Sequence, residues 1–331
     1  MSILYRDILY PILEELQYDK KSLASCFKVS KTWCEIVIPI LWRNPWDHLT
    51  LGKKELLLNK LLFNYISYCR HLNLEIIEDM FIINNQYMGI RNNILKLFIN
   101  KNVKYTHLYI PGYYDYHLIP GTERCFSEIK FLKYANTINT ESLTSLIKNS
   151  GEKLTKIRIF NSLAFSNVDN NKKIIQTIYQ SSPNLIYLEL YYKDSNILEL
   201  EKLLIKCQYL NKLEICSEFI NWNRLFNILT ISSPPNLFKF KIYFHVNKPK
   251  LKSLKLFFDN WEGRHPMSLI IGTENNFTYK NQLNDLINNY KAKGVVNDFT
   301  YYDSETKEKN VVKDLKTETV DIFNGFKKLF N

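Results

Sequence analysis

The side chains best suited to chemistry in this chain are its histidines and cysteines, six of each, and they are scattered along the sequence. No two cysteines form a C-x-x-C pair, and no histidine pairs with another histidine or a cysteine at metal-ligand spacing. His107 and His117 lie ten residues apart and close to Cys125. This trio leaves a metal site open as an alternative to surface or core roles, but we predict no bound metal.

Motifs of known catalytic sites are also missing. The sequence contains no H-E-x-x-H, no G-x-S-x-G and no phosphate-cradling G-x-x-x-x-G-K-[ST]. We therefore predict a binding protein without a cofactor, and not an enzyme. The run Tyr113-Tyr114-Asp115-Tyr116 could serve recognition, because exposed tyrosines give a large contact area at low entropy cost. The alternative is a loop that packs on its own domain.

Composition predicts a folded chain with substantial helix. Its 331 residues are 46% hydrophobic and 14% aromatic, enough to bury a sizeable core in one large or two modest domains. Glycine and proline are scarce, at 9 and 10 copies. This scarcity favours helices with short connections over a tight-turned β-sandwich.

The net charge of +11 is concentrated beyond Trp46, because the residues up to that point carry only +1. A basic surface can attract nucleic acid, an anionic membrane or an acidic protein, or can simply be well solvated. No basic run with interleaved aromatic residues marks a nucleic-acid site, which argues against that partner. The N-terminus lacks the charged and apolar regions of a signal peptide, and no stretch approaches the ~20 apolar residues of a membrane helix. We expect a cytoplasmic or nuclear protein with reduced thiols and no membrane partner.

The first forty residues predict three short helices. Ser22 and Ser30 can cap the second and third helices, and Pro39 is expected to end or kink the third. Three short helices cannot enclose a large core alone, so such a module leans on a partner or on the following domain. The first helix carries apolar residues at helical spacing, namely Leu4, Ile8, Leu9, Ile12, Leu13 and Leu16.

This module resembles an F-box. The family pattern is roughly L-P-x-E-I-L-x-x-I-F-x-x-L, then L-x-x-C-x-x-V-[CS]-[KR]-x-W. The matching residues here are Leu4-Tyr5-Arg6-Asp7-Ile8-Leu9, Ile12-Leu13, Leu16, Leu23, Cys26, Val29-Ser30-Lys31 and Trp33. The trailing Ile40-Leu41-Trp42 and Asn44-Pro45-Trp46 resemble a form found in large fungal F-box families. The resemblance covers residues 4–46, about one seventh of the chain.

The resemblance implies a three-helix domain that binds a Skp-family adaptor, which a cullin scaffold carries in an SCF-type ubiquitin ligase. Such a protein has no chemistry of its own and raises the effective concentration of a substrate near the ligase. Trp33 would be the strongest contact, as a large aromatic in a buried patch. The implied adaptor-binding residues, each of which could instead pack in the core, are Leu4, Ile8, Leu9, Leu13, Leu16, Val29 and Trp33.

Two departures from the family pattern leave a second possibility open. Tyr5 replaces the usual proline, and Pro11 falls within the predicted first helix. An interior proline costs ~3 kcal/mol, whereas a proline in the first turn costs little. A degenerate F-box that no longer binds the adaptor is therefore the alternative.

Beyond Trp46 the sequence repeats loosely, and the repeats resemble leucine-rich repeats. That template places apolar residues at positions 0, +3 and +5 of a short strand, with a period of about 20–29 residues. The better matches are Leu154-Ile157-Ile159, Leu185-Leu188-Leu190, Leu210-Leu213-Ile215, Leu237-Phe240-Ile242 and Leu251-Leu254-Leu256. The weaker matches are Cys69-Leu72-Leu74, Tyr105-Leu108-Ile110 and Ile129-Leu132-Tyr134.

Helical patterns lie between these strands, around Leu143, Ile174, Leu200 and Leu225. The family's Asn or Cys at position +8 is missing, because the better repeats have Ser162, Lys193, Glu218, His245 and Asp259 there. The solenoid is therefore expected to be irregular, and an ordinary α/β domain without repeats remains the alternative.

The predicted fold is α/β, with a small three-helix F-box followed by an irregular leucine-rich-repeat-like solenoid of strands and helices. The predicted domains are the F-box at 1–46, a repeat domain at 47–302 that binds an unknown protein substrate, and a charged linker with a short C-terminal helix at 303–331.

Overall fold

The computed structural model describes residues 3–26, 29–48, 65–83, 91–111, 119–135, 139–160, 168–217, 219–244, 248–272 and 277–302. The predictions for Tyr113–Tyr116, for His117 and for the segment 303–331 lie outside these residues. The described residues form two compact units. The first takes the residues up to Leu108 together with Ile119–Phe126, and the second takes Tyr109 and the residues from Ser127 onward.

Three short helices open the first unit. They are α1 (Ile3–Glu15), α2 (Lys20–Cys26) and α3 (Lys31–Leu41), with a 3-10 turn, η1 (Leu16–Tyr18), after α1. Their apolar faces meet because each helix repeats its apolar residues every three or four positions. The core they enclose consists of Leu9, Leu13, Leu23, Cys26, Ile36, Val37, Ile40 and Leu41.

The helix ends follow the sequence prediction in part. Ser30 caps α3, since its hydroxyl accepts a hydrogen bond from the Trp33 backbone N–H at 3.3 Å. The predicted cap at Ser22 is wrong, because α2 already begins at Lys20 and Asp19 accepts hydrogen bonds from the Ser22 N–H and hydroxyl. These two bonds lower the pKa of Asp19. Pro39 does not end α3, which continues to Leu41.

A nine-stranded sheet follows, and its spatial order is the order of the chain. Neighbouring strands from β3 to β9 are parallel. The α/β class predicted from the sequence is confirmed, with strands and helices alternating as in a solenoid. The strands are β1 (His71–Asn73), β2 (His107–Ile110), β3 (Phe131–Ala135), β4 (Lys156–Phe160), β5 (Tyr187–Tyr191), β6 (Lys212–Ser217), β7 (Lys239–Phe244), β8 (Met267–Gly272) and β9 (Val296–Tyr302).

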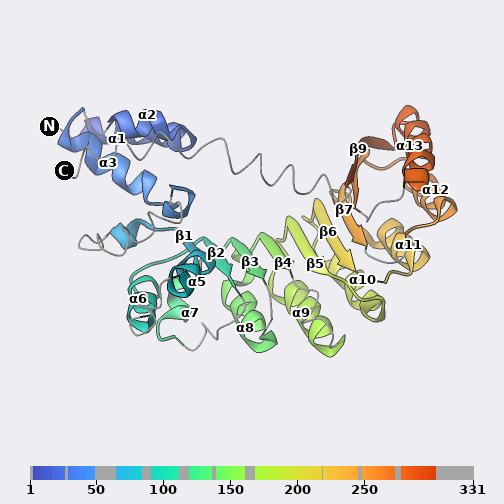
Figure 1. Cartoon of the computed structure of the whole chain (residues 1–331), viewed down its shortest axis with the longest axis horizontal. Helices are drawn as coiled ribbons and strands as arrows, with labels where there is room; N and C mark the ends of the chain where they lie inside the picture. The colour runs from blue at the N-terminus through green and yellow to red at the C-terminus, as the bar shows by residue number, and fades with distance from the viewer. Residues whose placement is uncertain are drawn as a thin grey trace. The chain divides into compact units, whose positions relative to one another are not determined.

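In the second unit one α-helix lies between each pair of consecutive strands, and these helices cover one face of the sheet (Figure 1). They are α8 (Thr140–Ser150), α9 (Val168–Ser181), α10 (Ile197–Lys206), α11 (Trp222–Ser232), α12 (Leu251–Asp259) and α13 (Phe277–Ala292). The first unit contributes η2 (Pro45–His48), η4 (Tyr65–Tyr68), α5 (Leu74–Ile83), α6 (Arg91–Phe98) and α7 (Thr122–Cys125).

The apolar template identifies β1 to β7 correctly, including the three weaker matches. Every residue at positions 0, +3 and +5 of these seven repeats is at most 2% exposed. The backbone hydrogen bonds follow the same period. The carbonyl at position +1 of one repeat accepts hydrogen bonds from two backbone N–H groups of the next repeat. Lys130 accepts from Thr155 and Lys156, and Ile186 accepts from Asn211 and Lys212. The repeat is therefore a structural unit as well as a sequence pattern.

The match at Leu251-Leu254-Leu256 is wrong as a strand, because these residues belong to α12. Leu254 is buried and Leu256 is 60% exposed. The strand of this repeat is β8, whose Leu269 and Ile271 lie in register with Phe240 and Ile242 of β7.

Asparagines that the template did not predict connect neighbouring repeats. The Asn196 side-chain amide donates to Asn171 Oδ1 at 2.8 Å, and the Asn171 amide donates to the Tyr191 carbonyl at 3.0 Å. Asn171 and Asn196 are both buried. Since buried backbone carbonyls need donors, this pair supplies hydrogen bonds that the family template assigns to position +8.

Candidate protein interaction surfaces

The structure gives no support to metal or thiol chemistry in the residues that it describes. No cluster of three or more His, Cys, Asp or Glu side chains suited to a metal ion occurs among them. The His107 ring stacks on that of His71 with centroids 3.8 Å apart. Burial raises the pKa of Cys69, Cys125 and Cys207 to about 12, so these thiols are poor nucleophiles near neutral pH.

Within the described ranges, no helix is both long enough and apolar enough to span a bilayer.

The structure separates the residues implied by the F-box resemblance into three groups. Leu9 and Leu13 are buried in the three-helix core. Leu16 and Trp33 are partly buried and pack against that core. Ile8 and Val29 are exposed, at 57% and 58%. Leu4 belongs to α1, but its side chain lies outside the described residues.

Part of the outward surface of α1 is apolar. Ile8 and Ile12, at 57% and 55% exposure, lie four residues apart and so share one face of the helix. Pro11 is exposed and lies in the interior of α1, not in its first turn. The two isoleucines form a small exposed apolar patch on adjacent turns of the helix.

Arg43, which follows α3, forms hydrogen bonds with another side of α1 and with the turn after it. The Arg43 guanidinium donates to Glu14 Oε1 at 2.7 Å and to the Tyr10 hydroxyl at 3.1 Å. It also donates to Gln17 Oε1 at 3.3 Å. Burial lowers the pKa of Arg43, but the hydrogen bond and charge of Glu14 raise it overall. Arg43 thus fixes α1 relative to the end of α3 and leaves Ile8 and Ile12 facing outward.

Polar and aromatic residues occupy the sheet face that the helices of the second unit leave uncovered. Along each strand the side chains alternate between the two faces, and the template residues point toward the helices. Among the remaining positions, two rows are in register across all of β3 to β7. We call these ten residues the open face: Phe131, Lys156, Tyr187, Lys212 and Lys239 in the first row, and Lys133, Arg158, Glu189, Glu214 and Lys241 in the second.

Two buried carboxylates organise the open face. Glu189 Oε2 accepts from Arg158 Nε at 2.6 Å and from the Tyr187 hydroxyl at 2.8 Å. Glu214 pairs with Lys212 at 2.7 Å and with Lys241 at 3.4 Å. Glu189 and Glu214 lie opposite each other on β5 and β6, where like charges would destabilise the sheet without these cations.

Burial and the ion pairs together shift the pKa values of the groups involved. Burial raises the pKa of Glu214, but the hydrogen bond from Lys212 and the charge of Lys241 bring it below its ordinary value. Burial and the charge of Glu189 raise the pKa of the Tyr187 hydroxyl. Glu214 is therefore a carboxylate at neutral pH, and Tyr187 is a neutral hydrogen-bond donor.

Replacement of Glu214 by Gln is expected to destabilise the second unit by about 1–2 kcal/mol near neutral pH, because Lys212 and Lys241 lose their buried counter-charge. The folded-state pKa of Glu214 is lowered from 4.5, so its contribution is present above that pH and is lost as pH falls below it. The difference in unfolding free energy between wild type and variant should therefore become smaller at acidic pH. Urea unfolding at neutral and acidic pH measures both effects.

Glu152→Gln is the matched control, because Glu152 is exposed and the change in net charge is the same. Two results would contradict the buried ion-pair arrangement. One is a loss of stability in Glu214→Gln no larger than that in Glu152→Gln, and the other is a stability difference from wild type that increases at acidic pH.

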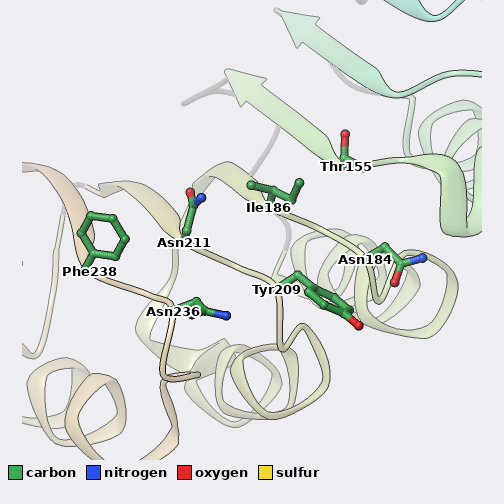
Figure 2. A pocket seen from close by; sticks show the side chains of 7 residues that line it. All are labelled: Thr155, Asn184, Ile186, Tyr209, Asn211, Asn236 and Phe238. Carbon is green, nitrogen blue, oxygen red and sulfur yellow. The ribbon is translucent and has the colours of Figure 1, made fainter. Parts of the chain in front are cut away.

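A shallow depression lies beside the open face, at the amino-terminal ends of β4 to β7 (Figure 2). Its volume is about 500 Å³, and Tyr209, at 61% exposure, forms part of its wall. Four of its residues directly precede first-row residues of the open face. The lining residues are Thr155, Asn184, Ile186, Tyr209, Asn211, Asn236 and Phe238. The depression therefore lies next to the first row of the open face, and three amide side chains and two aromatic rings contribute to its lining.

Neither a scan against models of known protein families nor a comparison with curated proteins finds a match to this chain.

Proposed function

We propose that this protein is a substrate-recognition adaptor of an SCF-type ubiquitin ligase. The N-terminal module binds a Skp-family adaptor and, through it, a cullin scaffold, while the repeat domain binds a protein substrate. The observation that carries the proposal is the exposure of Ile8, Ile12 and Val29 on a three-helix module that already has a closed core of its own. The F-box resemblance over residues 4–46 names the class of partner.

The exposed isoleucines contribute part of the binding energy that the proposal needs, and the adaptor's contacts with the rest of the module supply the remainder. Full burial of one isoleucine side chain is worth about 1.5–3 kcal/mol. Arg43, Tyr10 and Glu14 hold α1 in place before any partner arrives, so little ordering is required on binding. The repeat domain then brings a bound substrate near the ubiquitin-transfer machinery, and the gain is effective concentration.

Calorimetric titration of the full-length protein with a purified Skp-family adaptor tests the proposal. A complex with Kd of about 1 μM or tighter, equivalent to roughly 8 kcal/mol, is the expected result. A folded protein that gives no heat of binding and no pull-down with the adaptor would reject it. Trp33→Ala alone is a poor probe, because Trp33 packs against the core and its loss also weakens the fold.

Pro11 favours a second candidate, a repeat-type binding protein whose F-box is degenerate. An interior proline removes one backbone hydrogen bond of the helix and crowds the preceding turn, and Pro11 lies inside α1. Under the proposed function, Pro11→Leu leaves adaptor affinity within about threefold, because the helix already presents Ile8 and Ile12. The same titration measures it. Adaptor binding that appears only in the Pro11→Leu protein would establish the degenerate module instead.

A further inference from the structure

We propose that the open face binds an extended, acidic segment of a partner protein, rich in aspartate and glutamate. The inference rests on the proposed function only in treating that partner as the substrate, since binding itself needs no adaptor.

Charge is the first support. The open face holds six cationic side chains and two carboxylates. Both carboxylates are buried and paired, with Glu189 at 5% and Glu214 at 2% exposure. Within these ten residues the positive charges therefore outnumber the negative charges by four, and an anionic partner would gain from this excess.

Spacing is the second support. Lys156 and Lys239 are exposed and lie in the same row, on β4 and β7. Three strand intervals separate them, or roughly 14 Å. In an extended peptide crossing the strands, side chains four residues apart are separated by about the same distance. Two carboxylates of one acidic segment can therefore reach both lysines together.

Preorganisation is the third support. Glu189 and Glu214 hold Arg158, Lys212 and Lys241 in fixed positions through ion pairs. Long cationic side chains normally lose rotamer freedom when they bind, and this cost is reduced where they are already ordered.

The aromatic rings argue against single-stranded nucleic acid as the occupant. Nucleic-acid sites of this kind use free ring faces on which bases stack. Here the Lys212 ammonium lies 4.8 Å from the centre of the Tyr187 ring, and the Arg158 guanidinium lies 6.0 Å from it. Arg158 and Lys212 belong to β4 and β6, the two strands on either side of Tyr187. The Tyr187 ring therefore already contacts cations of this chain and is less available for stacking on a base.

Five of the six open-face cations are lysines, whose ammonium groups act as point charges toward any anion. The only arginine among the ten residues is Arg158, and its Nε donates to Glu189. Point charges spaced along the strands suit carboxylates distributed along an extended chain, and the phosphoserine peptide in the test below distinguishes these from phosphate.

Fluorescence anisotropy with the full-length protein tests the inference. The probes are a fluorescein-labelled peptide of alternating Glu and Gly, its Gln–Gly counterpart, a phosphoserine–Gly peptide and single-stranded DNA of similar length. The Glu–Gly peptide should bind most tightly, with an affinity that falls as salt rises. The double variant Lys156→Glu, Lys239→Glu should weaken its binding at least about tenfold.

The matched control is Lys206→Glu, Lys255→Glu, which makes the same change in net charge at exposed positions on α10 and α12. This control should bind the Glu–Gly peptide within about twofold of wild type. Equal losses in both double variants, tighter binding of DNA or phosphopeptide than of the Glu–Gly peptide, or no binding by the wild type would each overturn the inference.

Adaptor titration of the same variants separates this inference from the proposed function. The Lys156→Glu, Lys239→Glu protein should retain adaptor binding, because neither lysine belongs to the N-terminal module. Peptide binding without adaptor binding would reject the ligase role and keep the open-face site. Adaptor binding without peptide binding would reject the open-face site and keep the ligase role.

Discussion

A full-length protein with Ile8→Glu is expected to bind a purified Skp-family adaptor about 100-fold more weakly than wild type, equivalent to about 2.7 kcal/mol. Ile8 is 57% exposed on the outward face of α1, so a carboxylate at this position is hydrated in the free protein. Binding would transfer it to an apolar interface without a partner charge, which is strongly unfavourable. Calorimetric titration gives the affinity, and urea unfolding should show an unchanged midpoint.

Ile205→Glu is the control for this prediction. Ile205 lies in α10 and is 52% exposed, so the same substitution changes the same residue type at similar exposure in the repeat domain. Its adaptor affinity should match that of the wild type. If Ile205→Glu weakens binding as much as Ile8→Glu does, the interaction is general hydrophobic association. If Ile8→Glu binds normally, α1 does not form the adaptor surface.

The strands of the repeat domain could be predicted from the sequence because their signal is local. Apolar residues at +3 and +5 lie on one face of a strand, and the residue at position 0 enters the same core from the segment just before the strand. Even the weak match Ile129-Leu132-Tyr134 is buried in this way, and it includes a tyrosine. The residue types varied among repeats while the spacing stayed constant, so spacing was the more reliable guide.

The open face could not be predicted, because its interactions join residues far apart in the sequence. Arg158 and Glu189 are 31 residues apart, and they meet only because β4 and β5 are parallel and in register. A shift of one residue would move each side chain to the other face of the sheet. Positions +2 and +4 of each repeat could have been singled out as candidates, but their partners could not.

The residues proposed to bind the adaptor could be predicted only as a set, for a similar reason. Ile8 and Leu9 are adjacent and both apolar, yet one is exposed and the other lies in the core. The choice depends on where α3 crosses α1, and Arg43 helps to fix that arrangement through Glu14. Hydrophobicity alone cannot distinguish the two faces of a helix that is apolar on both.

The same ambiguity explains the wrong strand at residues 251–256. An apolar residue at position +3 suits a helix as well as this template, and Leu254 is followed by Phe257, Phe258 and Trp261. The spacing of three and four residues gives α12 one apolar face, and Trp261, just beyond the end of the helix, packs on Phe257. All four side chains are buried, at 2% exposure or less. The helical spacing of the apolar residues therefore predicts this segment correctly, whereas the three-residue strand template does not.

Alanine at Leu254 and at Leu256 should therefore have very different effects. Leu254→Ala leaves a cavity in the core and is expected to cost about 3 kcal/mol. Leu256→Ala removes a side chain that is 60% exposed and should change stability by less than about 0.5 kcal/mol. Urea unfolding followed by circular dichroism measures both. A strand built on the template would bury both leucines, so equal losses would contradict the helix, and a loss confined to Leu254 is what α12 requires.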